Sequence, residues 1–439
     1  MISTQANVSV RELQRSFTEK LGNCREVSLW IEVGGRIEWD GTHFSKRGHA
    51  VLLVSGNQLA AVIDGAELPD DWYCTLTSVL PGIRGFCFNH GVAATGLLEG
   101  HAHLFLDPGG ERSETNETEL RERARQNAER ALRHGVMWLR DCGDPGGINL
   151  WVRESLRRGL EPAPMIRACG AAIHRHKRYG KQLGLAVRDE TELMAAALDR
   201  ISCGADDIKL ILSGIVNFER AEVPGEPQFS ESAVCDVVKL ARDHGCRVIV
   251  HASGPAATAV AARAGVDTIE HAYFVTDDTL EVMAANRVVW LPTLSPVHVQ
   301  WRDAQRYGHS ENTRECLRRI LDGHAERIVR ASQMGVNIAG GSDSGSPGVG
   351  HGGGAVMEFK LLAEAGLGCE QAYRACGGPA AESIGFKTVA CGIQPGAPAD
   401  FLILDVSPLD NPAAFDLPRA VVRQGKLLAC CPASSRSAI

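Results

Sequence analysis

The sequence lacks several features by which common classes of protein are recognised. No apolar run approaches the ~20 residues of a membrane-crossing helix, and residues 1–5 have no basic segment leading into an apolar one, so neither a membrane span nor a secretory signal is expected. No block rich in Lys and Arg occurs, and the formal net charge of -7 argues against a nucleic-acid surface. The 14 cysteines include no C-x-x-C pair, which predicts reduced thiols in a cytoplasmic protein.

The middle of the chain alternates strand patterns with helix patterns. The 439 residues, of which 44% are hydrophobic and 23% charged, suit a barrel with a smaller partner domain. Strands are predicted at 97–98, 136–139, 165–168, 207–212, 247–251, 267–271, 288–291 and 336–339, and helices at 117–134, 190–202, 231–244, 256–264, 279–285 and 311–334. Such alternation indicates parallel strands, and the count closes a (β/α)8 barrel of the TIM type in the α/β class.

The two chain ends are predicted to form a separate small β domain. A helix is expected at 8–22, and strands at 27–33, 36–39, 50–54, 59–63, 399–405 and 420–428, of which the first two would form a hairpin. The strands near the C-terminus have no helix partners, so we place them with those near the N-terminus. The prediction is a β-sandwich built from residues 1–95 and 390–439 around a barrel domain of 96–389, with no role assigned to 83–95.

Side chains that can bind a metal follow several of the barrel strands. His101 and His103 come at the end of the first strand, where alternation puts both imidazoles on one side. Lys209 has only apolar neighbours within its strand, where an uncompensated ammonium is costly to bury. The other residues of this kind are His251, His271 and Asp343. Each alone has an ordinary explanation, but catalytic side chains of such barrels lie at the carboxyl ends of the strands, so the set predicts a metal site.

The ordered motifs resemble the amidohydrolase superfamily. They are EGHAHL at 99–104, WLRD at 138–141, GADDIK at 204–209, VHASG at 250–254, GVDTIEH at 265–271, GGSD at 340–343, HG at 351–352, EFKLLAEAG at 358–366 and PGAPAD at 395–400. More narrowly, the sequence is similar to the branch with a binuclear metal centre, which includes prolidase-like, Xaa-Arg dipeptidase-like and imidazolonepropionase-related proteins. The N-terminal region departs most from this pattern, because 83–95 separates Leu80-Pro81-Gly82 from the His-x-His strand.

The resemblance implies a hydrolytic mechanism at two divalent metal ions. Lys209 would carry a CO2-derived carbamate that bridges the ions, expected to be Zn2+, with Mn2+, Co2+ or Fe2+ as alternatives. His101, His103 and Asp343 would hold the more buried ion, and His251 and His271 the other. A hydroxide bridging the ions would attack the substrate carbonyl, and Asp343 would pass the proton to the leaving group.

The implied reaction is cleavage of a C–N bond in a small molecule, whether an amide, N-acyl amino acid, dipeptide, carbamate or urea. Lactone, ester or phosphotriester hydrolysis on the same centre stays open. A mononuclear deaminase fits less well, because the third residue after His251 is Gly254 where that branch has a glutamate. A non-catalytic scaffold would be expected to have lost metal ligands, and this chain has them all. No G-x-S-x-G nucleophile is present.

Substrate contacts are predicted on loops at the rim of the barrel. The candidates are Tyr273, His351, His174, His176 and Tyr179. Core packing for Tyr273, loop polarity for His351 and a solvated basic loop for 174–179 are alternatives of equal weight. A small-molecule substrate and a homo-oligomeric assembly are expected, with no nucleic-acid or membrane partner.

Overall fold

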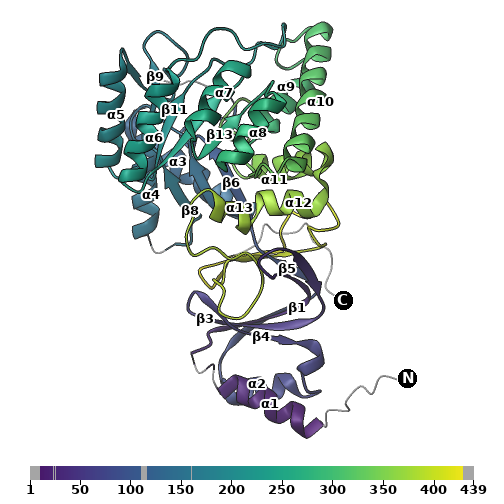
Figure 1. Cartoon of the computed structure of the whole chain (residues 1–439). Coiled ribbons are helices and arrows are strands. Elements are labelled where there is room, and N and C mark those ends of the chain that lie inside the picture. Colours follow the sequence, from purple (N-terminus) through teal and green to yellow (C-terminus); the bar gives the residue numbers. More distant parts are fainter. Residues whose placement is uncertain (1–9, 23, 25, 110–115, 160, 429–439) are drawn as a thin grey trace. The chain divides into compact units, whose positions relative to one another are not determined.

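The computed structural model describes residues 10–22, 24, 26–109, 116–159 and 161–428. It divides the chain into two compact units (Figure 1), in which Met1–Gly96 and Thr388–Ile439 form unit 1 and Leu97–Lys387 forms unit 2. The boundaries predicted from the sequence lay at 95/96 and 389/390. In the described part of the chain, no helix combines the length and the apolar character needed to cross a membrane.

Unit 2 alternates strands with helices, as expected for an α/β fold. In chain order its elements are β6 (Leu97–Ala102), α3 (Glu117–Arg133), β7 (Val136–Asp141), α4 (Ile148–Arg158), β8 (Met165–Ala168), β9 (Ala172–Arg175), β10 (Gly184–Val187), α5 (Glu190–Ser202), β11 (Asp207–Ile211), α6 (Glu231–Asp243), β12 (Arg247–Ala252), α7 (Pro255–Ala264), β13 (Thr268–His271), α8 (Asp277–Asn286), β14 (Val289–Leu291), α9 (Leu294–Arg302), α10 (Glu311–Gln333), α11 (Gly353–Leu362), a π-helix (Ala363–Leu367), α12 (Gly368–Cys376) and α13 (Gly378–Ser383). Helices α5, α6 and α7 pack against the strands beside them (Figure 1).

Backbone ladders join the strands of unit 2 into two parallel sheets. Their orders are β6-β7-β8 and β10-β9-β11-β12-β13-β14. Isolated bridges extend both sheets, because Trp290 in β14 pairs with Ile338 and Ala102 in β6 pairs with Ser344. The strand predicted at 336–339 is therefore reduced to a bridge at Ile338. The ladders of the described residues do not by themselves close a barrel.

The helices of unit 2 begin and end at residues suited to those positions. Side chains of Asn116, Ser230 and Ser310 cap α3, α6 and α10 by accepting a hydrogen bond from a backbone N–H of the first turn. Helix α7 begins at Pro255 and ends before Gly265, whose φ of 67° is left-handed. Helix α7 therefore stops where the chain turns back into β13.

Unit 1 contains one continuous mixed sheet where a β-sandwich was predicted. Its elements are α1 (Val10–Gly22), β1 (Leu29–Trp39), β2 (Phe44–Arg47), β3 (Ala50–Ser55), β4 (Gln58–Asp64), a 3-10 turn (Gly65–Glu67), α2 (Trp72–Val79), β5 (Arg84–Ala94), β15 (Phe401–Leu404), β16 (Ala420–Arg423) and β17 (Lys426–Leu428). The strand order is β17-β16-β15-β5-β1-β3-β4, with β2 paired to β1. The helix predicted at 8–22 is present from Val10, while residues 8 and 9 lie outside the described residues.

Two predictions for unit 1 need correction. The hairpin at 27–39 is wrong, because β1 runs straight through Gly34 and Gly35. A Cβ at Gly34 would lie 2.2 Å from the backbone oxygen of Asn89, so the glycine pair permits close approach and a register shift against β5 in place of a turn. The segment 83–95, left without a role, contains β5, which pairs parallel with β1 and antiparallel with β15. It thereby joins the two ends of the chain in one sheet.

Candidate metal centre and its cavity

A cavity of about 710 Å³ opens at the carboxyl ends of the strands of unit 2. All the predicted metal ligands line it, together with two of the predicted substrate contacts: His101, His103, Lys209, His251, His271, Asp343, Tyr179 and Tyr273. These residues come from β6, β11, β12 and β13 and from loops that follow strands. The expectation that the strand ends converge on one site therefore matches the structure.

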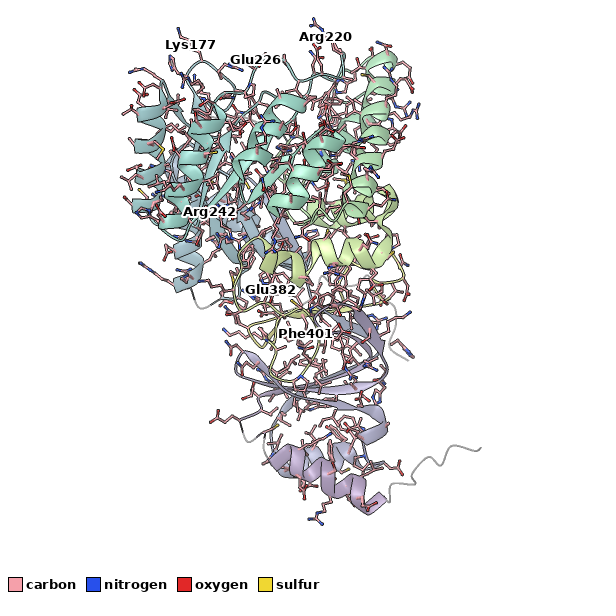
Figure 2. The ribbon with its side chains drawn as sticks, in the orientation of Figure 1. Lys177, Arg220, Glu226, Arg242, Glu382 and Phe401 are labelled. Carbon is pink, nitrogen blue, oxygen red and sulfur yellow. The ribbon has the colours of Figure 1, made fainter. Side chains whose placement is uncertain are left out.

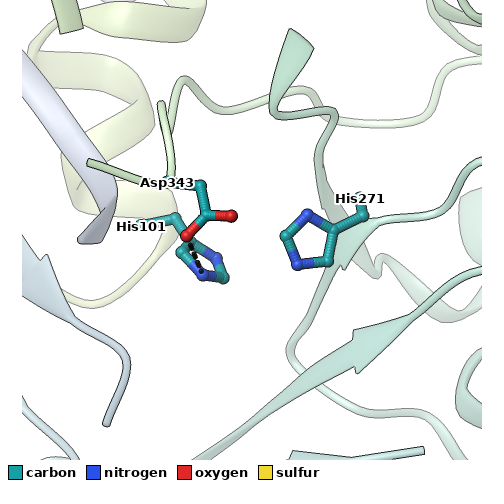
Figure 3. Close-up of side chains that lie close together, drawn as sticks. All are labelled: His101, His271 and Asp343. Atoms are coloured by element: carbon teal, nitrogen blue, oxygen red, sulfur yellow. Dashed lines mark ion pairs between the residues drawn. The ribbon is translucent and has the colours of Figure 1, made fainter. Parts of the chain in front are cut away.

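The three side chains that lie closest together as a potential metal site are His101, His271 and Asp343 (Figure 3). One ligand atom from each lies within 4.8 Å of the other two. Asp343 Oδ1 lies 3.5 Å from His101 Nε2 and 3.6 Å from His103 Nε2. The ring centroid of His271 is 5.0 Å from that of His101 and 4.6 Å from that of His251. His271 thus lies between the two groups of ligands assigned to separate ions from the sequence.

Three residues of this site have a strained backbone. His271, Thr293 and Asp343 have φ values of 68°, 51° and 55°, in the left-handed region that residues other than glycine rarely adopt. Such conformations cost of order 1–3 kcal/mol each and persist only where the surrounding structure enforces them, most often at functional sites. At Asp343 the conformation follows the turn Gly340-Gly341-Ser342, in which a Cβ on Gly341 would lie 2.9 Å from His101.

The histidines of the site are held neutral, which is the form that binds a metal. Burial lowers the pKa of His101 and His271 well below the usual value, and nearby Lys209 and the other imidazoles lower it further. Burial likewise lowers the pKa of His251 to about 4. The pKa of His103 is also lowered by burial, although the charge of Asp343 opposes this effect. Burial raises the pKa of Asp343, and the charges of His103 and Lys209 oppose this effect without reversing it.

Hydrogen bonds fix the orientation of most of the rings. His103 Nδ1 lies 2.8 Å from the carbonyl oxygen of Gly143, and His251 Nε2 lies 3.2 Å from that of Gly214. His271 Nδ1 lies 2.6 Å from the hydroxyl of Thr293. His101 Nδ1 is buried and has no hydrogen-bond partner among the described residues. Each of these bonds leaves the opposite ring nitrogen available for another ligand.

Glu270 compensates the buried charge of Lys209, and the sequence interpretation missed it. Lys209 Nζ forms an ion pair with Glu270 Oε2, and both side chains are almost completely buried. Arg140 donates to Glu270 Oε1 at 3.1 Å and to the carbonyl oxygen of Gly100 at 2.8 Å. Burial would raise the pKa of Glu270, but the charges of Lys209 and Arg140 outweigh it and lower the pKa. The sequence shows that Glu270 directly precedes His271 in a strand, but it does not show the pairing with Lys209 and Arg140, which are remote in sequence.

Asp141, next to Arg140, supports the loop that carries His103. Its carboxylate accepts hydrogen bonds from the backbone N–H groups of Leu104 and Gly143, at 2.8 and 3.0 Å. Burial raises the pKa of Asp141 to about 7. The WLRD motif therefore acts by holding the neighbouring strand end.

Three predicted substrate contacts lie outside the cavity lining. His351 is buried and its Nε2 is 3.2 Å from the carbonyl oxygen of Leu106. His174 is also buried, with Nδ1 3.0 Å from the carbonyl oxygen of Arg175, whereas His176 is exposed. Figure 2 shows Lys177, beside His176, on an outer loop of unit 2. Substrate contact by these histidines stays a prediction.

The two tyrosines that do line the cavity are held differently. Tyr273 donates from its hydroxyl to the carbonyl oxygen of Thr293 at 3.0 Å, and its ring stacks on His324 with centroids 4.0 Å apart. The ring of Tyr179 lies 5.3 Å from that of His251. Burial raises the pKa of both phenols, so both are neutral hydrogen-bonding groups.

Comparison with known proteins gives one consistent family. A sequence model of the Amidohydrolase family matches residues 92–428. An uncharacterized protein of Mycobacterium tuberculosis is 28% identical over 349 residues, which cover 77% of this chain and 86% of that protein. The ochratoxinase of Aspergillus niger is 25% identical over 323 residues, which cover 67% of this chain and 65% of that protein.

Solved structures agree with this match at the level of the fold. The crystal structure of a Xaa-Pro dipeptidase with bound methionine in the active site has a TM-score of 0.77 at 22% identity, covering 91% of this chain and 99% of that one. The crystal structure of A. niger ochratoxinase has a TM-score of 0.72 at 22% identity, covering 91% and 95%. At this level of identity the likeness shows a shared fold.

Proposed function

Because the chain belongs to the amidohydrolase family and is a hydrolytic enzyme acting on C–N bonds, we propose that it cleaves an amide-type bond in a small molecule with the help of two divalent metal ions. One observation carries this proposal. Neutral imidazoles and a carboxylate converge at the base of a cavity large enough for a small molecule. The likeness to a Xaa-Pro dipeptidase and to ochratoxinase supports an amide among the bonds considered from the sequence.

The donor set fits a metal. His101 Nδ1 is a buried ring nitrogen without a partner among the described residues, and the pKa shifts keep all four imidazoles unprotonated. We assign the ions to His101, His103, His251, His271, Asp343 and Lys209, with Zn2+ as the expected metal. When bound, such ions acidify water and polarise a carbonyl oxygen. Asp343 Oδ1 faces the imidazoles, so we assign Oδ2 to hold the proton that passes from water to the leaving nitrogen.

Lys209 is proposed to carry a carbamate when the metals are present. Its burial alone does not require this, because Glu270 already pairs with the ammonium. The support comes from position, since Lys209 lines the same cavity as the histidines and is 1% exposed. We further propose that the two sheets of unit 2 belong to one (β/α)8 barrel. The bridges at Ile338 and Ser344 support this arrangement.

Metal analysis combined with a substrate panel tests the proposal. Protein purified with Zn2+ should hold close to two equivalents and should hydrolyse at least one of a set of N-acyl amino acids, dipeptides, carbamates and ureas. Lys209→Ala should lose metal and activity together, and labelled bicarbonate should enter the wild type but not Lys209→Ala. Lys239→Ala is the matched control, because Lys239 is an exposed lysine paired with Asp243. Asp343→Asn should keep much of the metal while kcat falls by about 10²–10⁴.

Two results would contradict different parts of the proposal. Fully metallated protein that cleaves none of the amide-type substrates would refute the function. A fully active preparation with one equivalent of metal, or a Lys209→Ala variant with normal metal content and turnover, would refute the binuclear carbamate centre alone.

A further inference from the structure

We propose that Arg123 binds a carboxylate of the substrate, and that the enzyme therefore acts on amides of apolar amino acids or of closely related acids. This inference rests on the proposed amide hydrolysis and specifies the class of substrate. Arg123 lies in α3 and lines the cavity that contains the candidate metal ligands. Its side chain forms no hydrogen bond or ion pair with any residue that the structure describes.

The other arginines in the same part of α3 are engaged. Arg121 pairs with Glu117 and lies over the ring of Trp151 at 5.0 Å. Arg125 pairs with Glu122 at 2.7 Å and with Glu129. Such i,i+3 and i,i+4 pairs are the usual way in which a helix accommodates arginine. Arg123 differs from them because it faces the cavity and has no acidic partner in the described helix.

Arg123 also stands out among the charged groups of the cavity. The other Lys or Arg side chain of the lining, Lys209, is neutralised by Glu270. The acidic side chain of the outer lining, Asp107, accepts a hydrogen bond from the backbone N–H of Gly109 at 2.9 Å. A guanidinium presents its N–H groups as a planar fork that matches the two oxygens of a carboxylate. A substrate carboxylate would supply the partner that the described residues do not give to Arg123.

The rest of the cavity wall selects an apolar group. Ile215, Val216 and Phe218 line it from the loop that follows β11, and Val297 lines it from α9. Ile215 is 57% exposed, which is unusual for so large an apolar side chain. An apolar group of a bound substrate would cover it and remove that surface from water. Among the residues that the structure describes, the cavity thus combines an unpaired guanidinium with apolar surface beside the candidate metal centre.

Matched acids and amides provide the test. The zinc-loaded enzyme is assayed with N-acetyl-leucine and N-acetyl-phenylalanine and with their carboxamides, which lack only the negative charge, by release of acetate. We expect kcat/KM of the wild type to be about 10- to 100-fold higher for the acids, because hydrogen bonds between charged groups contribute at this level. In Arg123→Met the acids should lose most of this advantage, mainly through KM, and Arg123→Lys should retain part of it. Arg125→Met should behave as the wild type, because Arg125 is not among the described residues that line the cavity and pairs with Glu122 and Glu129.

Equal kcat/KM for acid and amide in the wild type, or an acid preference that survives in Arg123→Met, would overturn the inference while leaving amide hydrolysis in place. If neither compound is cleaved, the proposed function is in doubt, but Arg123 is still tested by calorimetric binding of L-phenylalanine and L-phenylalaninamide. Tighter binding of the acid by the wild type and its loss in Arg123→Met would support the inference. Equal binding of the two compounds would refute it.

Discussion

Thr293 is expected to control metal binding through a single hydroxyl group. Its Oγ1 lies 2.6 Å from His271 Nδ1, and Thr293 is completely buried. A metal on Nε2 requires the ring N–H to be on Nδ1, and Thr293 Oγ1 is placed to accept a hydrogen bond from it. The carbonyl oxygen of Thr293 accepts from Tyr273, so the backbone that presents the hydroxyl is itself held in place.

Thr293→Val isolates this hydroxyl. Valine keeps the β-branch and therefore the strain of a residue with φ of 51°, so the change removes one polar group and little else. A buried nitrogen left without its partner costs about 1–3 kcal/mol. Loss of such a partner behind a metal-binding histidine typically weakens metal affinity by about 10- to 100-fold. The free-energy cost and the loss of metal affinity agree in size, because a factor of ten in an equilibrium constant corresponds to about 1.4 kcal/mol.

The assay is titration of metal-free protein with Zn2+ against a competing chelator. Thr293→Val should show the loss, and Thr293→Ser, which restores a hydroxyl, should recover most of the affinity. Thr258→Val is the control, because Thr258 is equally buried but donates to the carbonyl oxygen of Gly254, which precedes α7, at 2.8 Å. Zinc affinity of Thr293→Val within twofold of the wild type would show that the hydroxyl does not position His271.

Two further predictions concern stability. Gly100→Ala should lower the free energy of unfolding by about 1–3 kcal/mol, because its Cβ would lie 2.6 Å from the backbone oxygen of Gly340. Gly323→Ala in α10 should raise it by about 0.5–1 kcal/mol, because the new Cβ would lie in open space. Thermal melts that shift in the same direction for both variants would contradict this. Burial raises the pKa of Glu358 to about 7, so its contribution to stability is present below about pH 4.5 and is lost as pH rises through 7. In urea unfolding of the metal-free protein, Glu358→Gln should reduce the change in unfolding free energy between pH 5 and 8 by up to ~3 kcal/mol, whereas Glu364→Gln, at an exposed position, should leave it unchanged. Parallel pH profiles for the wild type and both variants would refute the argument.

The sequence allowed prediction of the features that depend on periodicity and on side chains with few ordinary uses. The strands β7 and β12 lie where apolar runs end in polar residues, and His101, His251 and His271 occupy such ends. Because the carboxyl ends of parallel strands lie on the same side of a sheet, a local pattern sufficed to predict a shared cavity. Family membership then agreed with the motifs on which the resemblance depended.

Features decided by long-range pairing could not be predicted in the same way. Gly34-Gly35 has the local signature of a turn, and only the approach of the Asn89 backbone from β5 makes it a continuous strand. The strand β5 itself has no clean alternation, and it is stabilised by β1 and β15 from the two ends of the chain. Glu270 was passed over for a related reason, since its partners Lys209 and Arg140 are remote in sequence.

The charges around Lys209 predict that the proposed carbamate and metal binding depend on each other. Without metal, the buried Lys209, Glu270 and Arg140 carry two positive charges and one negative charge, and Glu270 is shared between the cations. A carbamate would turn this into two negative charges beside Arg140 alone, and two anions buried so close together repel strongly at low dielectric. Divalent ions held by the histidines would supply the missing positive charge. If Lys209 is carbamylated as proposed, the ammonium should be favoured in the metal-free protein and the carbamate in the metallated one, so that loss of either should release the other.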